Sequence, residues 1–334
     1  MSILTATFWI IVWVYAFGKV AGWVKIPHIV ALILVGLFLN IPQIHALFLQ
    51  GAPVDVFVSD LGDIALVALM LLAGLETSVK EFKHESKEAV SISLIAALTP
   101  FTVGFLAFYW LGYDLLAAMV VGVSMSITAE ATTAALLLEL KKIKSRVGTL
   151  MMEAGIIDDV LGMSLFVMIT LILDQVHLRE DVLLVVAILA FFLGILLQKR
   201  FHRAHVSIVA LKKWTFLLIV PFFFVSMGSH FDLQSVLLSP QLLGIILLIA
   251  FFGKMGGTFL ARPFTRLTWR QLHLIGWAMN SRGAVGLALA LLAFRTHLIS
   301  VELYSSLLLM SLLTTIAFPF VITRMIRRHP KIMD

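Results

Sequence analysis

The chain has 334 residues, of which 61% are hydrophobic and 13% are charged, and its mean hydropathy is +1.05. Soluble domains carry about 25% charged residues, so this composition excludes a soluble protein and indicates a polytopic membrane protein. The net charge of +6 comes from short basic clusters between apolar runs. That pattern orients membrane helices and argues against nucleic-acid binding. Because the chain has no cysteine, disulfides and thiolate chemistry are excluded.

Apolar runs long enough to cross a bilayer occur along the whole chain. A spanning helix needs about 17 to 25 predominantly apolar residues. The sequence therefore predicts an all-α protein with about eleven transmembrane helices, at 3–24, 27–48, 57–79, 89–112, 114–139, 147–173, 181–201, 213–231, 236–261, 270–294 and 301–326. We expect Pro42 to end the helical part of the second span early, because proline lacks the N–H that continues a helix.

Basic residues alternate between the predicted loops. The loops after the odd-numbered helices from the first to the ninth, together with the C-terminus, hold most of the 25 Lys and Arg residues. The opposite loops hold only Arg179 and Arg295. The positive-inside rule then predicts a multi-pass protein of the cell membrane, with its N-terminus outside and its C-terminus in the cytoplasm.

The sixth predicted helix carries two adjacent aspartates, Asp158 and Asp159. They lie about 18 Å from its basic end at Arg146, near the bilayer midplane. Burying one charge there costs roughly 3 to 17 kcal/mol depending on the method, so the pair indicates a cation site or a proton relay. Carboxylate oxygens suit a hard cation such as Na⁺. Glu153 lies about 10 Å inside the same end, where it either lines a cytoplasmic funnel or faces water.

Two segments in related positions indicate an internal repeat. The third predicted helix ends in Leu71–Val79 and the eighth ends in Phe223–Leu233, and each runs into an amphipathic stretch. The third helix runs inward and the eighth runs outward, so the two related units have inverted topology. We therefore predict a single membrane transport domain over 1–334, with a first inverted repeat at 27–173 and a second at 181–326. In such transporters the substrate binds near the midplane, where the repeats meet.

The fifth and tenth predicted helices correspond in the two repeats, and both carry polar stretches at mid-span. The first is Ser124–Thr133, which includes Thr128 and Glu130, and the second is Asn280–Gly286, which includes Arg282. Unwound backbone at this depth is tolerated only where protein buries it or where it lines a cavity, and its free carbonyls can bind cations. The sequence thus predicts two broken, crossing helices beside the aspartates.

Several motifs occur in an order that resembles a known family. They are Ser126-x-Thr128, Lys144–Gly148, Ile157–Leu161, Phe223–Gly228, Phe252–Lys254 and Ser281–Gly283. Together they resemble the sodium/hydrogen exchanger domain of the monovalent cation:proton antiporter family over nearly the whole chain. The adjacent aspartates are similar to those of its electrogenic double-aspartate branch.

The resemblance implies a role for each matched residue. Asp159 matches the aspartate that binds the cation and its competing protons. Asp158 matches the aspartate that pairs with a lysine, here Lys254, and Thr128 matches a hydroxyl of the first broken helix. The resemblance also implies a homodimer that exchanges Na⁺, and Li⁺, for H⁺ electrogenically, with a role in pH regulation and without a cofactor.

The chain departs from the family pattern in two places. Many members have proline and glutamate in the second broken helix where this chain has Ser281 and Ala284. We expect Glu130 to replace the missing acid as the partner of Arg282. Only the helix at 181–201 separates the Asp-Asp helix from the Phe-Phe-Val-Ser segment, so the second repeat is expected to lack its first helix. No regulatory nucleotide-binding domain is expected within the chain.

Three other functions are alternatives to sodium/proton exchange. The closest is K⁺/H⁺ antiport, which needs the same kind of site. A passive channel fits less well, because an inverted repeat and a buried Lys254 suit alternating access. An intramembrane aspartyl protease needs two aspartates that face each other and share a proton. Neighbouring residues on one helix point about 100° apart, so Asp158 and Asp159 do not meet that requirement.

Overall fold

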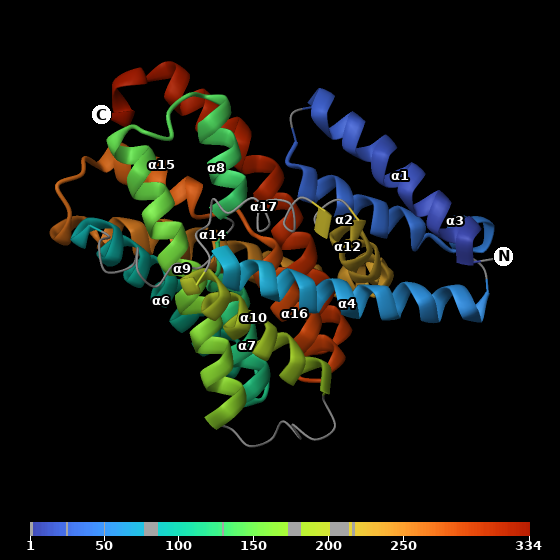
Figure 1. Ribbon diagram of the computed structural model, residues 1–334. Helices are drawn as coiled ribbons and strands as arrows, with labels where there is room; N and C mark the ends of the chain where they lie inside the picture. Colours follow the sequence, from blue (N-terminus) through green and yellow to red (C-terminus); the bar gives the residue numbers. More distant parts are fainter. Residues whose placement is uncertain are drawn as a thin grey trace. The chain divides into compact units, whose positions relative to one another are not determined.

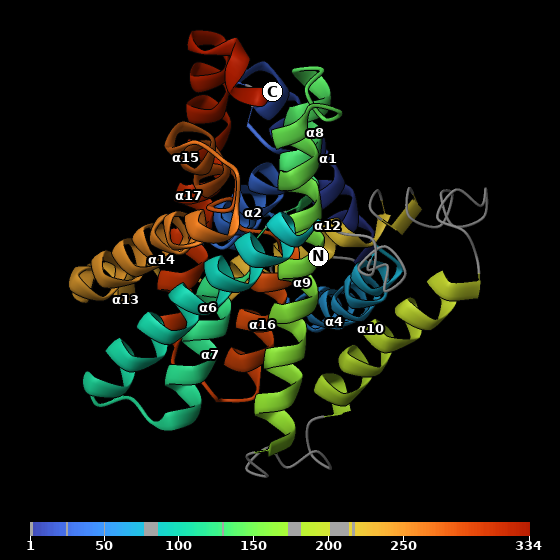
Figure 2. The ribbon, with the colours of Figure 1, turned by 90° about the vertical axis from the view of Figure 1, so that its left-hand side faces the viewer.

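The protein is described here by a computed structural model that covers residues 3–24, 26–49, 51–76, 86–128, 130–172, 182–200, 214–215 and 218–334. Within these ranges the chain is almost entirely α-helical and contains no strand (Figure 1 and Figure 2). The all-α expectation is confirmed. The predicted helix ends at 79, 173, 181, 201 and 213 lie outside the described residues.

The chain divides into two compact units, each built from two separate stretches of sequence. Unit 1 comprises Met1–Ser78 and Leu178–Asp232, and unit 2 comprises Val79–His177 and Leu233–Asp334. Each unit therefore takes helices from both halves of the chain. The repeat boundaries at 27–173 and 181–326 stay a prediction.

Unit 1 contains six described helices. They are α1 (Ile3–Val24), α2 (His28–Leu39), α3 (Pro42–Phe48), α4 (Ala52–Glu76), α10 (Val182–Arg200) and α12 (Val220–Ser229). α10 packs along α4, and α12 packs on both α2 and α4. α1 packs on α2, and rings from α1, α2 and α3 form an aromatic cluster of Trp9, Trp13, Phe17, Phe38 and Phe48.

Glycines set the close approach of these helices. α10 meets α4 where Gly194 faces Gly74, and α12 meets α2 where Gly228 faces Gly36. A Cβ atom built on any of these four glycines would overlap backbone atoms of the facing helix. Small residues are the usual contact between membrane helices because they let the backbones approach closely. Van der Waals contact between backbones thus holds unit 1 together.

A Gly194→Ala substitution is expected to lower the thermal stability of the purified protein. Its new Cβ would overlap the carbonyl oxygen of Leu71 and lie 2.8 Å from the amide nitrogen of Leu75. Overpacking of this kind costs about 1 to 3 kcal/mol. Gly244→Ala is the matched control, because no atom lies within 4 Å of its added Cβ. Equal melting temperatures for the two variants in detergent would contradict this packing account.

Unit 2 contains nine described α-helices. They are α6 (Lys87–Trp110), α7 (Leu115–Ser126), α8 (Glu130–Glu139), α9 (Arg146–Ile172), α13 (Leu233–Leu238), α14 (Pro240–Leu260), α15 (Trp269–Ala278), α16 (Ala284–Arg295) and α17 (Val301–Arg328). Two 3₁₀ turns, η1 (Arg262–Phe264) and η2 (Pro330–Met333), follow α14 and α17. α6 packs against α7, α9 and α14, so it lies at the centre of these contacts.

Polar side chains begin several of these helices. Ser86, Asp114 and Ser300 each accept a hydrogen bond from the backbone N–H three residues later. Thr268 and Gln271 form a capping box at the start of α15. Such caps satisfy N–H groups that have no partner within the helix. The starts of α6, α7, α15 and α17 are therefore fixed by local sequence.

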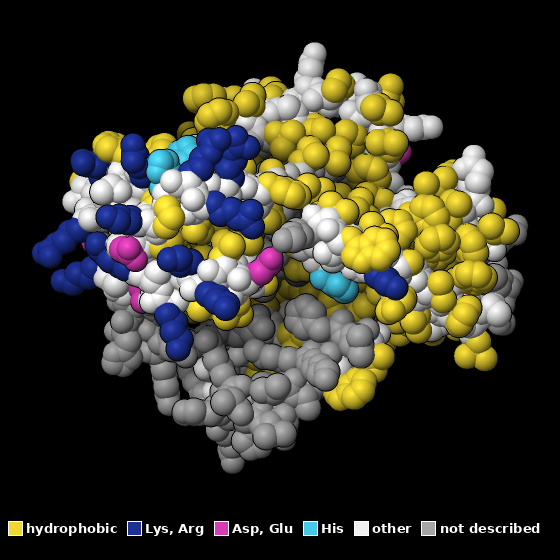
Figure 3. Space-filling view, turned by 90° about the horizontal axis from the view of Figure 1, so that it is seen from above, with side chains coloured by type: hydrophobic (Ala, Val, Ile, Leu, Met, Phe, Trp, Pro, Cys, Tyr) yellow, Lys and Arg dark blue, Asp and Glu magenta, His cyan; other side chains and the backbone are white. Residues whose placement is uncertain are grey.

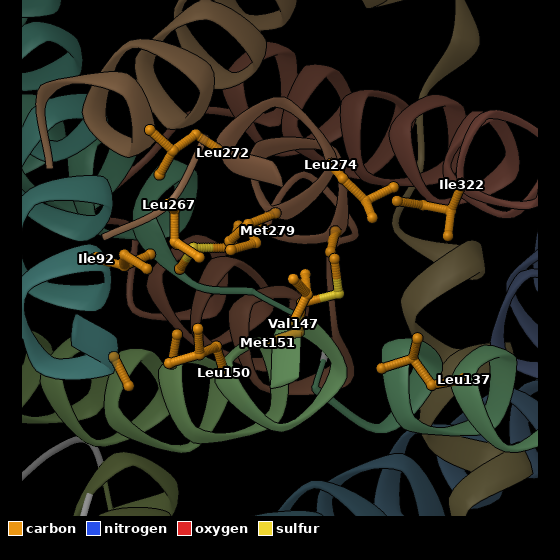
Figure 4. Close-up of a cluster of buried hydrophobic side chains, with 14 of the residues drawn as sticks. Ile92, Leu137, Val147, Leu150, Met151, Leu267, Leu272, Leu274, Met279 and Ile322 are labelled. Atoms are coloured by element: carbon orange, nitrogen blue, oxygen red, sulfur yellow. The ribbon is translucent and has the colours of Figure 1, made fainter. Parts of the chain in front are cut away.

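One end of unit 2 is closed by a large apolar cluster that joins α6, α8, α9, α15, α17 and η2. Ile92, Val147, Met151, Leu272 and Ile322 belong to it, and Figure 4 shows their side chains converging from different helices. Met333 of η2 is fully buried in the same cluster. This core holds α9, which carries Asp158 and Asp159, and α15, which leads to Arg282, in one body.

Within the described ranges, the second, fifth, ninth and tenth predicted spans are interrupted. The second divides into α2 and α3, which are bent by 89° at their junction. Pro42 begins α3, since proline at the first helical position loses no hydrogen bond. Pro240 likewise begins α14, so the ninth span divides into α13 and α14. The fifth and tenth spans divide into α7 and α8, and into α15 and α16, as the sequence predicts.

Five of the described helices are long and apolar enough to cross a membrane, or six spans if the bent α2–α3 pair counts as one. The five include α1, α4, α6, α14 and α17. The remaining predicted spans correspond to shorter or broken helices and to α9, which carries Glu153, Asp158 and Asp159. The described helices confirm a polytopic membrane protein.

Candidate functional site

A buried ion pair joins α9 to α14 in unit 2. Lys254 Nζ lies 2.8 Å from Asp158 Oδ1 and 2.9 Å from Asp158 Oδ2, and both side chains are completely buried. The neighbouring glycines of α14, Gly253 and Gly257, press against Pro100 and Ala96 of α6. This close approach fixes the helix that carries Lys254. The predicted pairing of Asp158 with a lysine has the geometry of a charge-assisted hydrogen bond.

The same face of α9 meets the break between α7 and α8. Gly155 lies against Glu130, the first residue of α8, and Gly162 lies against the side chain of Ile127. Residues 155, 158, 159 and 162 share one face of a helix, so the two aspartates stand between these contacts. Thr128 belongs to the facing stretch and is buried, and Asp159 is partly buried. The structure thus brings both aspartates to the first break.

The two broken helices cross and are joined by hydrogen bonds. Thr128 Oγ1 donates to the carbonyl oxygen of Met279 at 3.1 Å. The guanidinium of Arg282 donates to the carbonyl oxygens of Ile127 at 2.8 Å and of Ala250, in α14, at 3.2 Å. Thr133 and Ser281 also lie within 3.4 Å through their hydroxyl oxygens. Side chains near the breaks thus satisfy the carbonyls of Ile127 and Met279, which the interruptions leave without helical partners.

The ends of the half-helices give the crossing its own electrostatic field. α7 and α15 end there, and the carbonyls at a helix C-terminus carry partial negative charge. Arg282 complements that charge through its bond to Ile127. α8 begins there, and its first-turn residue Glu130 complements the positive N-terminus. The pairing of Glu130 with Arg282 stays a prediction.

Buried hydroxyls line the last turn of α7. The Oγ atoms of Ser124 and Ser126 are enclosed and form no hydrogen bond within the described part of the chain. A buried polar atom without a partner is costly, so such atoms commonly bind water or an ion. Like the carboxylates of Asp158 and Asp159, these hydroxyls are oxygen ligands, which suit a hard monovalent cation better than a soft metal.

Glu153 has a structural role that sequence reasoning did not identify. Its Oε2 accepts hydrogen bonds from Ser86 Oγ at 2.8 Å and from the Ser86 N–H at 3.3 Å. Ser86 is the N-cap of α6, so Glu153 joins α9 to the start of α6. Its suggested place in a cytoplasmic funnel stays a prediction.

Thr315 of α17 is a site residue that the sequence analysis missed. Its Oγ1 accepts from the backbone N–H of Arg282 and donates to the Arg282 carbonyl oxygen, both at 3.1 Å. One hydroxyl therefore holds both backbone groups of a residue outside any helix. A mid-span Thr followed four residues later by Pro319 was the available signal, because that proline removes the helical partner of the Thr315 carbonyl.

A Gly162→Ala substitution is expected to reduce transport more than it reduces stability. The added Cβ would overlap the side chain of Ile127 and push α9 away from the first break. Small displacements of positioned groups can cost about a hundredfold in rate. Gly256→Ala is the control, because its Cβ would meet no atom within 4 Å. Initial transport rates in proteoliposomes test this, and Gly162→Ala combined with Ile127→Ala should restore the rate. Full activity of Gly162→Ala alone would contradict it.

Two interrupted helices that cross beside a buried carboxylate–ammonium pair are the architecture expected of a secondary transporter. Comparisons with known proteins agree. The chain matches the family described as "Sodium/hydrogen exchanger, transmembrane" over residues 8–198 and 185–328. This protein therefore belongs to the sodium/hydrogen exchanger family. It is a cation/proton antiporter and not an enzyme, and the predicted recognition is confirmed at the level of the family.

Individual relatives are distant but align over most of their length. The Na(+)/H(+) antiporter of Enterococcus hirae is 22% identical, with 89% of this chain and 91% of the relative covered. The probable Na(+)/H(+) antiporter GerT of Bacillus cereus is 24% identical over 87% and 92%. Among solved structures, the sodium proton antiporter MjNhaP1 of Methanocaldococcus jannaschii superposes with a TM-score of 0.63 at 16% identity, covering 97% and 96%. That likeness supports the fold.

Proposed function

We propose that this protein exchanges Na⁺ for H⁺ across the cell membrane by alternating access, with Asp159, Asp158 and Thr128 at the ion-binding site. The observation that carries the proposal is the position of the two aspartates on the face of α9 that meets the first break. Hydroxyls and unwound carbonyls there offer the oxygen ligands that Na⁺ needs. The antiporters of Enterococcus hirae and Bacillus cereus supply the sodium assignment by similarity.

Competition for the same carboxylates couples the two ions. A carboxylate that has bound a proton no longer attracts Na⁺, and bound Na⁺ disfavours the proton. A loaded or protonated site is less costly to move past an apolar barrier than a bare charged one. Rocking between two states then gives exchange instead of leak. Li⁺, which also prefers oxygen ligands, is expected to replace Na⁺.

The Asp158–Lys254 pair makes the exchange electrogenic in this proposal. Asp158 releases its proton and pairs with Lys254 in one state, and the pair separates in the other. The protons moved one way then outnumber the Na⁺ ions moved the other way, so each cycle carries a net charge across the membrane. The proposal places this chain in the electrogenic double-aspartate branch, where Asp158 is the distinguishing residue.

We further propose a homodimer in the cell membrane, with the N-terminus outside and the C-terminus in the cytoplasm. The basic residues at the ends of α14 and α17 support this orientation by the positive-inside rule. The outward apolar side chains of α1, among them Leu4, Tyr15 and Trp23 at 83%, 70% and 76% exposure, suit contact with lipid or with a second copy.

Potassium is the second candidate cation. The Na(+)/H(+)-K(+) antiporter GerN of Bacillus cereus is 22% identical over 78% of this chain, so potassium transport occurs in a relative of similar distance. The site described above binds by oxygen ligands, which both cations accept.

Purified protein in proteoliposomes tests the proposal. Fluorescence dequenching of a trapped pH dye is recorded after addition of Na⁺, Li⁺ or K⁺ at several pH values. We expect dequenching with Na⁺ and Li⁺, and acceleration or slowing by an imposed membrane potential. Dequenching with K⁺ alone would favour K⁺ as the transported cation. An exchange rate that does not change with the membrane potential would overturn the electrogenic mechanism.

A further inference from the structure

The 260–270 segment, which links α14 to α15, exposes both arginines and large apolar side chains. Its exposed arginines are Arg262, Arg266 and Arg270. Its exposed apolar side chains are Leu260, Phe264 and Trp269, at 62%, 63% and 56% exposure. The guanidinium carbon of Arg262 lies 4.7 Å from the centroid of the Trp269 ring. Tryptophan prefers the level of the lipid headgroups, and a cation held over its face is positioned there as well.

The 260–270 segment belongs to a strongly basic end of unit 2. The other exposed basic residues at this end are Lys87, Lys141, Lys144, Arg146, Arg324, Arg327, Arg328 and Lys331. Figure 3 shows Lys and Arg side chains gathered on one part of this face, with few acidic side chains among them. The surface potential there is therefore positive.

One carboxylate near the 260–270 segment is already engaged. Glu88 accepts from the guanidinium of Arg146 at 3.1 Å and from the backbone N–H of Arg266 at 2.7 Å. Within the described residues, no carboxylate forms an ion pair with the guanidinium of Arg262, Arg266 or Arg270. The charge of Arg266 also interacts with Glu88, so Arg262 and Arg270 are the guanidinium groups most open to an external anion.

We propose that the 260–270 segment is a headgroup site for an anionic phospholipid of the surrounding bilayer. Guanidinium groups bind phosphate oxygens in a bidentate manner, and anionic headgroups attract arginines next to a membrane span. Leu260, Phe264 and Trp269 contact the upper part of the acyl chains, which a soluble anion lacks. Apolar and basic side chains on one short segment thus match the two parts of a lipid.

Lipid at this position acts on the start of α15. The 260–270 segment contains Thr268, which forms the capping box of α15 with Gln271. α15 leads directly to the second break, where Arg282 binds Ile127. A bound headgroup therefore stabilises the helix that holds one side of the crossing. This lipid site does not depend on which cation is transported.

Native mass spectrometry of the purified protein tests the proposal, with phosphatidylglycerol and phosphatidylcholine supplied in equal amounts. Wild type is expected to retain phosphatidylglycerol preferentially. Arg262→Gln alone should weaken that retention about fivefold, since one basic residue near an anionic surface contributes about that factor. The triple variant Arg262→Gln, Arg266→Gln and Arg270→Gln should lose the preference. The matched control carries Arg324→Gln, Arg327→Gln and Arg328→Gln, the same charge change at the end of α17, and should keep it.

Three results would overturn this site. The first is an equal loss in the two triple variants, which would show a diffuse field without a site. The second is unchanged retention in the segment variants. The third is displacement of phosphatidylglycerol by millimolar inorganic phosphate, which would show a site for a soluble anion. Melting temperatures measured in phosphatidylcholine alone verify folding, and the single Arg262→Gln variant decides the matter if the triple variant does not fold.

Discussion

Replacing Asp159 with asparagine is expected to abolish Na⁺-driven proton movement in proteoliposomes. Asparagine keeps the size of the side chain but removes the charge that binds the cation and the proton it exchanges. Loss of one charged ligand weakens binding by about 1.5 to 3 kcal/mol, or roughly ten- to a hundredfold. Because the variant also cannot carry a proton, exchange should fall further, to the level of empty liposomes.

A control variant distinguishes loss of the ion-binding carboxylate from the general effect of removing one negative charge. Glu139→Gln removes one carboxylate at the exposed end of α8 and should leave the rate unchanged. Melting temperatures in detergent verify that Asp159→Asn is folded. Wild-type exchange in Asp159→Asn would reject the site assignment, whatever the behaviour of the control.

Removal of Lys254 is expected to destabilise the protein strongly. Lys254→Met leaves the carboxylate of Asp158 buried without its partner, which is 2.8 Å away in the wild type. Breaking a buried pair from one side costs about 3 to 5 kcal/mol, so the melting temperature should fall. The current per transported proton should also change, because Asp158 then lacks the charge that favours its ionised form.

A double variant tests the pair itself. Lys254→Met combined with Asp158→Asn removes both charges, so no unpaired ion is buried. Its melting temperature should be higher than that of Lys254→Met alone, which is the non-additivity expected of residues in contact. If both variants melt as the wild type does and carry the same current, the pair has no role in stability or in coupling.

Sequence patterns predicted the helices well where length and hydropathy decide them. The first span, 3–24, coincides with α1, and the predicted interruptions at Thr128 and Arg282 occur as breaks in the structure. The divisions at Pro42 and Pro240 were not predicted in that form. A proline ends the helix that precedes it, but it can also be the first residue of a new helix. Whether a new helix begins depends on how the following residues pack.

The sequence predicted the charged side chains of the site but not the backbone groups to which they bind. Lys254 and Asp158 could be paired through the family resemblance because both are charges in apolar spans. The pairing of Arg282 with Glu130 stays a prediction, and the bonds of Arg282 to the carbonyl oxygens of Ile127 and Ala250 were not foreseen. The direction of a backbone carbonyl depends on the tertiary structure and cannot be read from the amino-acid sequence. The contact of Glu153 with Ser86 spans 67 positions and is hidden for the same reason.

The two hydrogen bonds between Thr315 and the backbone of Arg282 lower the entropic cost of ion binding. A segment without helical hydrogen bonds would ordinarily sample many conformations, and a ligand would have to select one at a cost in entropy. Here the N–H and the carbonyl of Arg282 are both fixed by one side chain. The backbone at Arg282 is therefore ordered during folding, before any ion binds. In the proposed mechanism, an arriving ion meets a preorganised crossing, so little of its binding free energy is spent on ordering the backbone at Arg282.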